Sequence, residues 1–277
     1  MAGKKKDTSL LHHLIGSRSL VWNLAKNDIK KKFAGSYFGV VWAFVQPVIT
    51  VLLYWFVFEK GLNSKATDLR TGIEIPFVLW LTAGLVPWFY FQEALNGGTG
   101  VLVEYSYLVK KVVFQIDMLP VVKMISALFT HLFFVAFTIV LFICMGYMPD
   151  WYALQVIYYS FCMILFATGL VYATSAVTVF FRDMKEVVGI LLQIGMWVTP
   201  IMWNFETMVQ IPGWAITLLK LNPMYYIVSG YRNALINHIG FWEDMGLTVY
   251  FWVVTAVILF LGTTVFKKLR PHFADVL

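Results

Sequence analysis

Charged residues are scarce in this sequence. They make up 13% of the 277 residues, whereas hydrophobic residues make up 60%, and the mean hydropathy is +0.75. Soluble domains carry about 25% charged residues, so this composition excludes an ordinary soluble protein. The apolar residues gather in long runs that short charged loops separate. This pattern predicts an all-α integral membrane protein.

The sequence also lacks motifs that would give the chain a chemistry of its own. It contains no phosphate-binding loop of the form G-x-x-x-x-G-K-[ST], because the segment NGGTG at 96–100 lacks the lysine and the hydroxyl residue. No H-E-x-x-H motif and no paired Cys/His spacing occurs. We therefore expect no catalytic residue, no metal site and no cofactor in this chain. Any energy source must be a partner protein or an ion gradient.

Cysteine is nearly absent too. Cys144 and Cys162 both lie in apolar runs and are expected to be small buried hydrophobic residues rather than disulfide partners. A cleavable signal peptide is not expected, because the basic start at Lys4, Lys5 and Lys6 is not followed by a long apolar run.

Six apolar runs are long enough to cross a hydrocarbon core, which needs about 20 helical residues. They lie near 37–58, 76–95, 119–146, 153–180, 187–204 and 246–266. The stretch 205–240 is apolar but interrupted by proline and glycine, and we expect short re-entrant helices there, on the outer side. The predicted organisation is a cytoplasmic N-terminus with an interfacial helix (1–36), a transmembrane domain (37–266) and a cytoplasmic tail (267–277).

The distribution of basic residues predicts the orientation. The N-terminal segment, the loops 96–123 and 181–186 and the tail after 266 hold 16 of the 21 lysines and arginines. Basic residues are concentrated on the cytoplasmic side of membrane proteins, so both termini and the segment RDMKE (182–186) are predicted to be cytoplasmic. The net charge of +6 follows these loops, and no nucleic-acid partner is expected.

An amphipathic segment precedes the first apolar run. Trp22, Ala25, Ile29 and Phe33 recur at helical spacing, and a basic face is formed by the lysines Lys26, Lys30, Lys31 and Lys32. We expect a helix along the inner leaflet whose lysines meet lipid headgroups. An ordinary basic flank of a membrane span is the alternative.

Aromatic residues make up 18% of the chain, which is more than two interfacial belts require. Several lie deeper in the apolar runs: Trp42, Tyr54, Trp55, Trp80, Trp88, Tyr90 and Trp197. Aromatic faces stack on sugar rings, so these residues are candidates for the lining of a carbohydrate pathway. Core packing and contact with lipid are the alternatives for each of them.

Ionisable residues inside the apolar runs are few. Only His131 is near mid-depth, whereas Glu93 and Lys123 lie near the ends of their runs. His131 fits either a proton relay or a hydrogen-bonded packing residue. One histidine gives little support to an ion-coupled carrier.

Five segments together resemble a known family. GSYFGVVWAFVQPVITVLLYWFVF (35–58), IPFVLWLTAGLVPWFYF (75–91), FFRDM (180–184), TPIMW (199–203) and LNPMYYIVSGYRNAL (221–235) are similar to the permease subunits of type-2 ABC exporters. Within that family they resemble the polysaccharide-export branch, and YWFVF and GLVPWFYF are most similar to wall teichoic-acid exporter permeases.

The resemblance implies a second copy of the chain, two copies of a separate ATPase that binds ATP and Mg, and a polyprenyl-diphosphate-linked polymer as substrate. The multi-pass permease would lie in the bacterial cytoplasmic membrane. It also implies short coupling helices that contact the ATPase, with these candidates: Glu104, Tyr105, Tyr107, Leu108, Lys110, Lys111, Arg182, Asp183, Lys185 and Glu186. For RDMKE, a plain solvated turn is the alternative.

Other functions remain open at this stage. The polymer could be O-antigen or capsular polysaccharide, or the substrate could be a drug or a small lipid. An ion-coupled carrier or a scaffold is disfavoured by the sparse charge inside the membrane runs.

Overall fold

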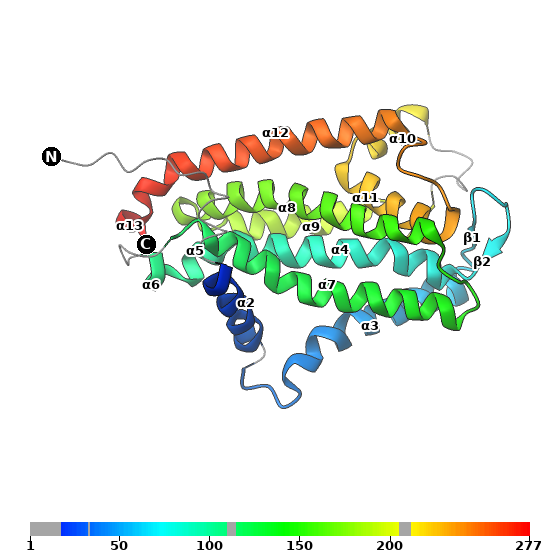
Figure 1. The fold of residues 1–277 in the computed structure, drawn as a ribbon, viewed down its shortest axis with the longest axis horizontal. Coiled ribbons are helices and arrows are strands. Elements are labelled where there is room, and N and C mark those ends of the chain that lie inside the picture. The colour runs from blue at the N-terminus through cyan, green and yellow to red at the C-terminus, as the bar shows by residue number, and fades with distance from the viewer. Residues whose placement is uncertain (1–17, 33, 110–114, 205–211) are drawn as a thin grey trace.

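A computed structural model describes residues 18–32, 34–109, 115–204 and 212–277 as a helical bundle with one short β-hairpin (Figure 1). Lys110 and Lys111 lie outside the described residues. The hairpin joins β1 (Ala66–Thr67) to β2 (Glu74–Ile75) in antiparallel register. The α-helices are α2 (Arg18–Lys32), α3 (Trp42–Trp55), α4 (Phe77–Thr99), α5 (Val101–Glu104), α6 (Ser106–Val109), α7 (Met118–Cys144), α8 (Gln155–Phe180), α9 (Met184–Val198), α10 (Gly213–Lys220), α11 (Pro223–Arg232), α12 (Met245–Leu269) and α13 (Phe273–Val276).

Shorter helical turns extend several of these elements. A π-helical turn (Phe56–Gly61) continues α3, and another (Asn233–Asn237) continues α11. Three-residue and four-residue 3₁₀ turns lie at Gly39–Val41, at Trp151–Leu154 before α8, and at Arg270–His272 between α12 and α13.

Four helical segments have the length and apolarity to cross a membrane: Trp42–Gly61, Met118–Cys144, Trp151–Phe180 and Met245–Val276. Each falls on one of the predicted runs. The other two predicted spans coincide with α4 and α9, which are not among the four. α9 has only 15 residues, and α4, with 23, carries Gln92, Glu93 and Asn96 in its second half. Six spans and the cytoplasmic placement of both termini therefore stay predictions.

The long helices α4, α7, α8 and α12 and the shorter α9 run side by side (Figure 1). The hairpin lies at one end of this bundle, which we call the hairpin end. We call the opposite end of the bundle the loop end. It contains α5, α6, α13, the C-terminus and the turn between α8 and α9. α2 packs across α7 near the loop end, and α3 leans away from the bundle.

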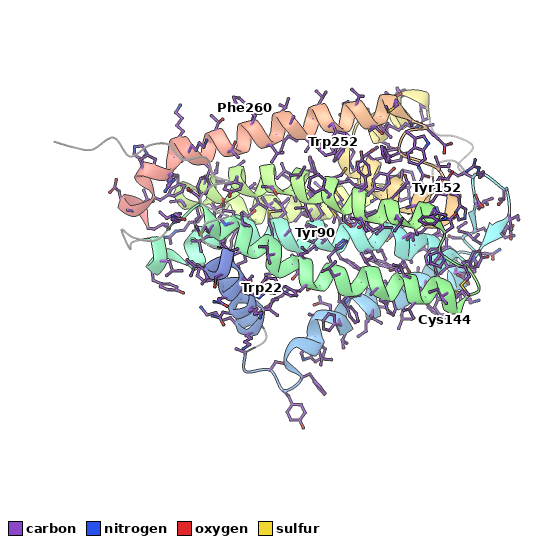
Figure 2. The ribbon with its side chains drawn as sticks, in the orientation of Figure 1. Trp22, Tyr90, Cys144, Tyr152, Trp252 and Phe260 are labelled. Carbon is purple, nitrogen blue, oxygen red and sulfur yellow. The ribbon has the colours of Figure 1, made fainter. Side chains whose placement is uncertain are left out.

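α4 forms the centre of the bundle, because α7, α8, α9 and α11 all pack against it. Most of its side chains are buried, including the predicted pathway residues Trp80, Trp88 and Tyr90. Figure 2 shows Tyr90 inside the bundle and Phe260 of α12 on its outside. One sequence expectation is wrong: Cys144 is exposed, because it is the last residue of α7 and lies beyond the packed part of the bundle, whereas Cys162 is buried.

The short α9 ends at a defined signal. Thr199 precedes Pro200 and has extended dihedral angles, which a following proline favours over helical ones. α11 then begins where the Asn222 side chain accepts a hydrogen bond from the backbone N–H of Met224 at 3.0 Å, with Pro223 in the first turn. The predicted short helices within 205–240 are therefore found as α10 and α11, and residues 205–211 lie outside the described residues.

Arg232 joins these segments at the hairpin end. Its guanidinium is buried and donates hydrogen bonds to the backbone carbonyl oxygens of Pro200 (2.7 Å), Ile201 (2.6 Å) and Trp80 (3.3 Å). It also lies 3.3 Å from the centroid of the Trp80 ring, a cation–π distance. Gly84 leaves the space this requires, since a Cβ there would be 2.7 Å from Nη2. One side chain thus holds α4, the end of α9 and α11 together.

We expect Arg232→Lys to destabilise the protein although it keeps the positive charge. The planar guanidinium group of arginine reaches three carbonyl oxygens at once, and the compact ammonium group of lysine cannot. Each buried acceptor left unsatisfied costs about 1–3 kcal/mol. The apparent melting temperature of the purified protein in detergent should fall clearly. Arg70→Lys is the matched control, because Arg70 is exposed and bonds only one backbone oxygen, that of His238, among the described contacts. Equal melting temperatures for the two variants would contradict this role of Arg232.

Candidate functional site

A cavity of about 780 Å³ lies between α2, α3, α4 and α7, with Met196 of α9 also on its wall. Its polar lining comes mainly from amide and hydroxyl side chains: Gln46, Thr50, Tyr54, Gln92, Asn96, Ser126 and Thr130. Its apolar lining includes Trp42, Pro47 and Phe89. The cavity therefore combines hydrogen-bonding groups with aromatic surface inside a largely apolar bundle.

Charged side chains of both signs gather at one side of this cavity. Lys123 Nζ is 2.6 Å from Asp28 Oδ1 and 2.9 Å from Glu104 Oε2. Lys32 Nζ is 2.6 Å from Glu93 Oε1. The first pair is mostly buried, since the side chains of Lys123 and Asp28 are 14% and 6% exposed. These contacts tie α2 to α4, α5 and α7.

Tyr105, between α5 and α6, completes this charged cluster. Its side chain is buried, and its hydroxyl donates a hydrogen bond to Asp28 Oδ1 at 2.8 Å. Burial, together with the bond to the Asp28 carboxylate, raises the pKa of the Tyr105 hydroxyl well above its ordinary value. The hydroxyl therefore stays protonated and remains a donor to Asp28 at neutral pH.

One face of α2 packs against the bundle. Val21, Ala25 and Asp28 are buried against the start of α7, and Asp28 pairs there with Lys123. Trp22 is 44% exposed and contacts the ring of Phe129, Ile29 is half-buried, and Phe33 lies outside the described residues. Figure 2 marks Trp22 on α2. The predicted contact of the apolar residues of α2 with the inner leaflet stays a prediction.

The four lysines of α2 are exposed, and a contact with lipid headgroups requires such exposure. Lys31 and Lys32 line the cavity, and Lys31 Nζ lies 5.2 Å from the Tyr105 ring centroid and 5.9 Å from that of Tyr107. Lys26 lies over the ring of Trp22, and Lys30 is exposed to the surroundings. A headgroup role for these four residues stays a prediction.

The predicted pathway aromatics divide into two sets. Trp42 and Tyr54 line the cavity, Trp55 is half-buried next to it along α3, and Trp197 on α9 is 57% exposed. Trp80, Trp88 and Tyr90 are buried inside the protomer, where Trp80 carries Arg232 and Tyr90 lies beside His131 at a ring distance of 5.2 Å. Within one protomer, Trp42 and Tyr54 line the cavity and the second set is used for packing. A pathway role for any of the seven stays a prediction.

The predicted coupling residues lie at the loop end. Glu104 and Tyr107 are exposed, Leu108 is half-buried, and Tyr105 is occupied by its contact with Asp28. Arg182 and Asp183 form a tight turn, and Lys185 and Glu186 belong to the first turn of α9. The expected second coupling helix is therefore not a separate element. All four charged side chains are exposed, and Lys185 also lies across Gly100, which follows α4 directly.

His131 is buried in a small polar network. Its Nε2 lies 3.2 Å from Ser160 Oγ and 3.1 Å from the hydroxyl of Tyr231. Ser160 and Tyr231 also contact each other at 2.5 Å. No carboxylate takes part in these contacts among the described residues, so the geometry matches that of a hydrogen-bonded packing residue.

Comparison with known proteins identifies the family. The model of the family "ABC-2 type transporter" matches residues 19–236, well over half of the chain. The chain belongs to the ABC-2 type transporter family. It is therefore a membrane transporter component, which agrees with its apolar helices.

Similar proteins cover nearly the whole chain. An O-antigen export system permease protein, RfbA, from Myxococcus xanthus is 25% identical over 266 residues, 96% of this chain and 98% of the relative. A protein of the same name from Klebsiella pneumoniae is 22% identical over 258 residues, 92% of this chain and 93% of the relative. A further one from the same organism is 21% identical over the same shares of both chains.

We expect Asp28→Asn to loosen α2, because Lys123 would lose its buried carboxylate partner at a cost of about 1–3 kcal/mol. A Val21→Cys reporter, buried in the present structure, should then react faster with a maleimide in a background without Cys144 and Cys162. Glu74→Gln is the matched control, since Glu74 pairs with Lys65 at a site where both side chains are more than half exposed. An unchanged reaction rate in Asp28→Asn would contradict the anchoring of α2 by this pair.

Proposed function

We propose that this chain is the transmembrane subunit of an ATP-driven exporter that moves a polyprenyl-diphosphate-linked cell-surface polysaccharide across the bacterial cytoplasmic membrane. The observation that carries the proposal is the cavity, considered together with the family. Its wall offers amides, hydroxyls and aromatic rings, which are the groups that bind sugars. The relatives named for O-antigen export support a polysaccharide as the substrate class.

The cavity suits a chain of sugars better than a small apolar drug. Gln46, Gln92 and Asn96 each provide both donors and acceptors, and Trp42 and Tyr54 provide ring surface. Such a wall can form hydrogen bonds with the hydroxyl groups of a sugar chain at several positions of the chain. A repeating polymer can therefore move past the wall one unit at a time. A purely apolar wall would leave the hydroxyl groups of a sugar without partners.

The charged side of the cavity suits the diphosphate of the lipid carrier. Lys31 and Lys32 are exposed and line the cavity, and a diphosphate would compete with Glu93 for Lys32. Phosphate binds lysine ammonium groups by charge-assisted hydrogen bonds. Lys26 and Lys30 would extend this attraction along α2.

A second copy of the chain and two copies of a separate ATPase complete the proposed exporter. The ATPase would bind ATP and Mg and would contact the loop end, where Tyr107, Arg182 and Asp183 are exposed. α3 and α9 expose apolar side chains, among them Leu53 and Ile190, on faces that suit a second copy or lipid. This chain would therefore contribute no catalytic residue.

For the polymer itself we propose wall teichoic acid, on the wording of YWFVF (54–58) and GLVPWFYF (84–91). O-antigen or capsular polysaccharide is the second candidate, and the relatives named for O-antigen export favour O-antigen. The two differ in charge, since teichoic acids carry a phosphate in each repeat. Drug or small-lipid export is the remaining alternative within the family.

The decisive experiment reconstitutes the chain with the ATPase subunit that co-purifies with it. We expect a polyprenyl-diphosphate-linked polymer to stimulate ATP hydrolysis severalfold, whereas polyprenyl phosphate alone should not. Teichoic-acid-type and neutral O-antigen-type polymers are tested side by side, and the stronger stimulator identifies the class. Absence of a co-purifying ATPase, or hydrolysis that no lipid-linked polymer changes, would refute the proposed function.

Charge reversal at the turn between α8 and α9 tests the contact with the ATPase. We expect the double variant Arg182→Glu, Asp183→Lys to lower export about fivefold or more while the protein remains folded. Both side chains are exposed, and neither takes part in an ion pair among the described residues, so the bundle itself should tolerate the change. The control variant reverses Lys65, which is exposed beside the hairpin at the far end. Export equal to that of the control would show that this turn is merely solvated.

A further inference from the structure

The C-terminal segment Arg270–Leu277 folds back against the loop end of the bundle instead of trailing from it (Figure 1). Phe273 is completely buried. It belongs to an apolar cluster with residues of α5, α7, α8 and α12 and with Tyr105, among them Val101, Leu119, Tyr172 and Phe266. The segment is therefore an integral part of the loop end.

One contact of this segment reaches the end of the first loop. Arg270 Nη1 donates a hydrogen bond to Asp117 Oδ2 at 2.7 Å, and the Asp117 side chain is only 7% exposed. Asp117 is the residue immediately before α7, so it connects the loop that carries α5 and α6 to that helix. Its backbone carbonyl oxygen also accepts a hydrogen bond from the hydroxyl of Tyr172 on α8, at 2.8 Å.

A second contact reaches the other loop. The ring of Phe273 lies 6.2 Å from that of Phe180 and 5.5 Å from that of Phe266. Phe180 is the last residue of α8, and Arg182 and Asp183 follow it in the turn to α9. The same short segment thus touches the end of the first loop and the start of the second.

The position of the segment is itself fixed by the crossing of α8 and α12. Gly169 and Gly262 face each other there, and a Cβ on Gly262 would overlap the backbone carbonyl oxygen of Gly169. The two helix backbones therefore approach closely, as small residues allow in membrane helices. α12 cannot shift along α8 without breaking this contact, so the segment that follows α12 is held at a set place.

We propose that Arg270–Leu277 is a clamp that holds the two ATPase-facing loops at a fixed spacing, and that Arg270 and Phe273 are positioning residues for the coupling of ATP hydrolysis to export. This inference rests on the proposed function. Without the clamp, the hydrogen bond from Tyr172 to Asp117, the packing of α5 against α8 and the side chain of Lys185 over Gly100 still join the two loops, but the contacts of Arg270 with Asp117 and of Phe273 with Phe180 are lost. A force applied to one loop would then be lost in local movement instead of moving α7, α8 and α12 together.

The test measures how many polymers are exported per ATP hydrolysed by the complete complex with its ATPase. Arg270→Gln removes the charge, Arg270→Lys keeps a cation within reach of Asp117, and Phe273→Leu removes the ring while keeping an apolar side chain. We expect Arg270→Gln and Phe273→Leu to co-purify with the ATPase and to hydrolyse ATP, but to lose about fivefold or more of the export per ATP. Arg270→Lys should restore most of it.

Lys268→Gln is the matched control, since Lys268 is exposed in the last turn of α12 and the substitution removes the same charge.

A second measurement follows the loops directly, with spin labels at Tyr107 and Arg182 in a background without Cys144 and Cys162. The distribution of distances between the labels should broaden in Arg270→Gln and stay narrow in Arg270→Lys and in the control.

The outcomes separate the clamp from the proposed function. If the wild-type complex shows no export that depends on ATP, the proposed function fails, and the clamp fails with it. If the wild-type complex couples and Arg270→Gln couples equally well, only the clamp is overturned. A lower melting temperature together with unchanged export per ATP and an unchanged distance distribution would also overturn it, because the segment would then serve stability alone.

Discussion

The buried backbone carbonyls of the turn that follows α9 impose the constraint on which the hairpin end depends. A buried carbonyl oxygen without a hydrogen-bond donor is costly. α9 stops after 15 residues, and in the turn beyond it Arg232 supplies the donors for Pro200 and Ile201 while also reaching Trp80. That single group explains why α11 returns into the bundle, why Gly84 has no side chain and why Trp80 is a packing residue. The three segments are far apart in the chain, and the guanidinium makes them one unit.

The need to pair buried polar groups also shapes the cavity, where ion pairs take the place of the carbonyl contacts. Asp28 brings a charge on α2 against the start of α7, and this is tolerable only because Lys123 and the hydroxyl of Tyr105 meet it. Lys123 in turn needs Glu104, so α2, α5 and α7 are held by one cluster. The cavity lies beside these paired charges.

The length and order of the helices could be predicted from the apolar runs, but their contact faces could not. α4 is apolar around most of its circumference, so periodicity gave no reason to bury Trp88 and Tyr90 while Trp42 of α3 lines the cavity. On α2 the apolar spacing gave no sign that Asp28 would be buried in an ion pair with Lys123. Arg232 was missed although a signal was present: an isolated arginine in an otherwise uncharged apolar segment indicates a buried partner set. The predictions of the family and of the coupling loops rested on the resemblance of five sequence segments to known permeases, and not on periodicity.

The polar wall of the cavity, rather than the exposed apolar helices, is the stronger reason to expect another molecule beside this chain. Only 6% of the apolar window of the segment Trp42–Gly61 is buried, compared with 56% for Trp151–Phe180. An apolar face costs nothing in lipid, so this exposure does not distinguish lipid from a second copy. Gln46 lies on the same helix and lines the cavity, and an amide that faces hydrocarbon without partners is costly, whereas the hydroxyl of Thr50 already donates to the backbone oxygen of Gln46. Water, a polar substrate or a second polar wall would satisfy the Gln46 amide, and each of these requires the cavity to be shielded from lipid.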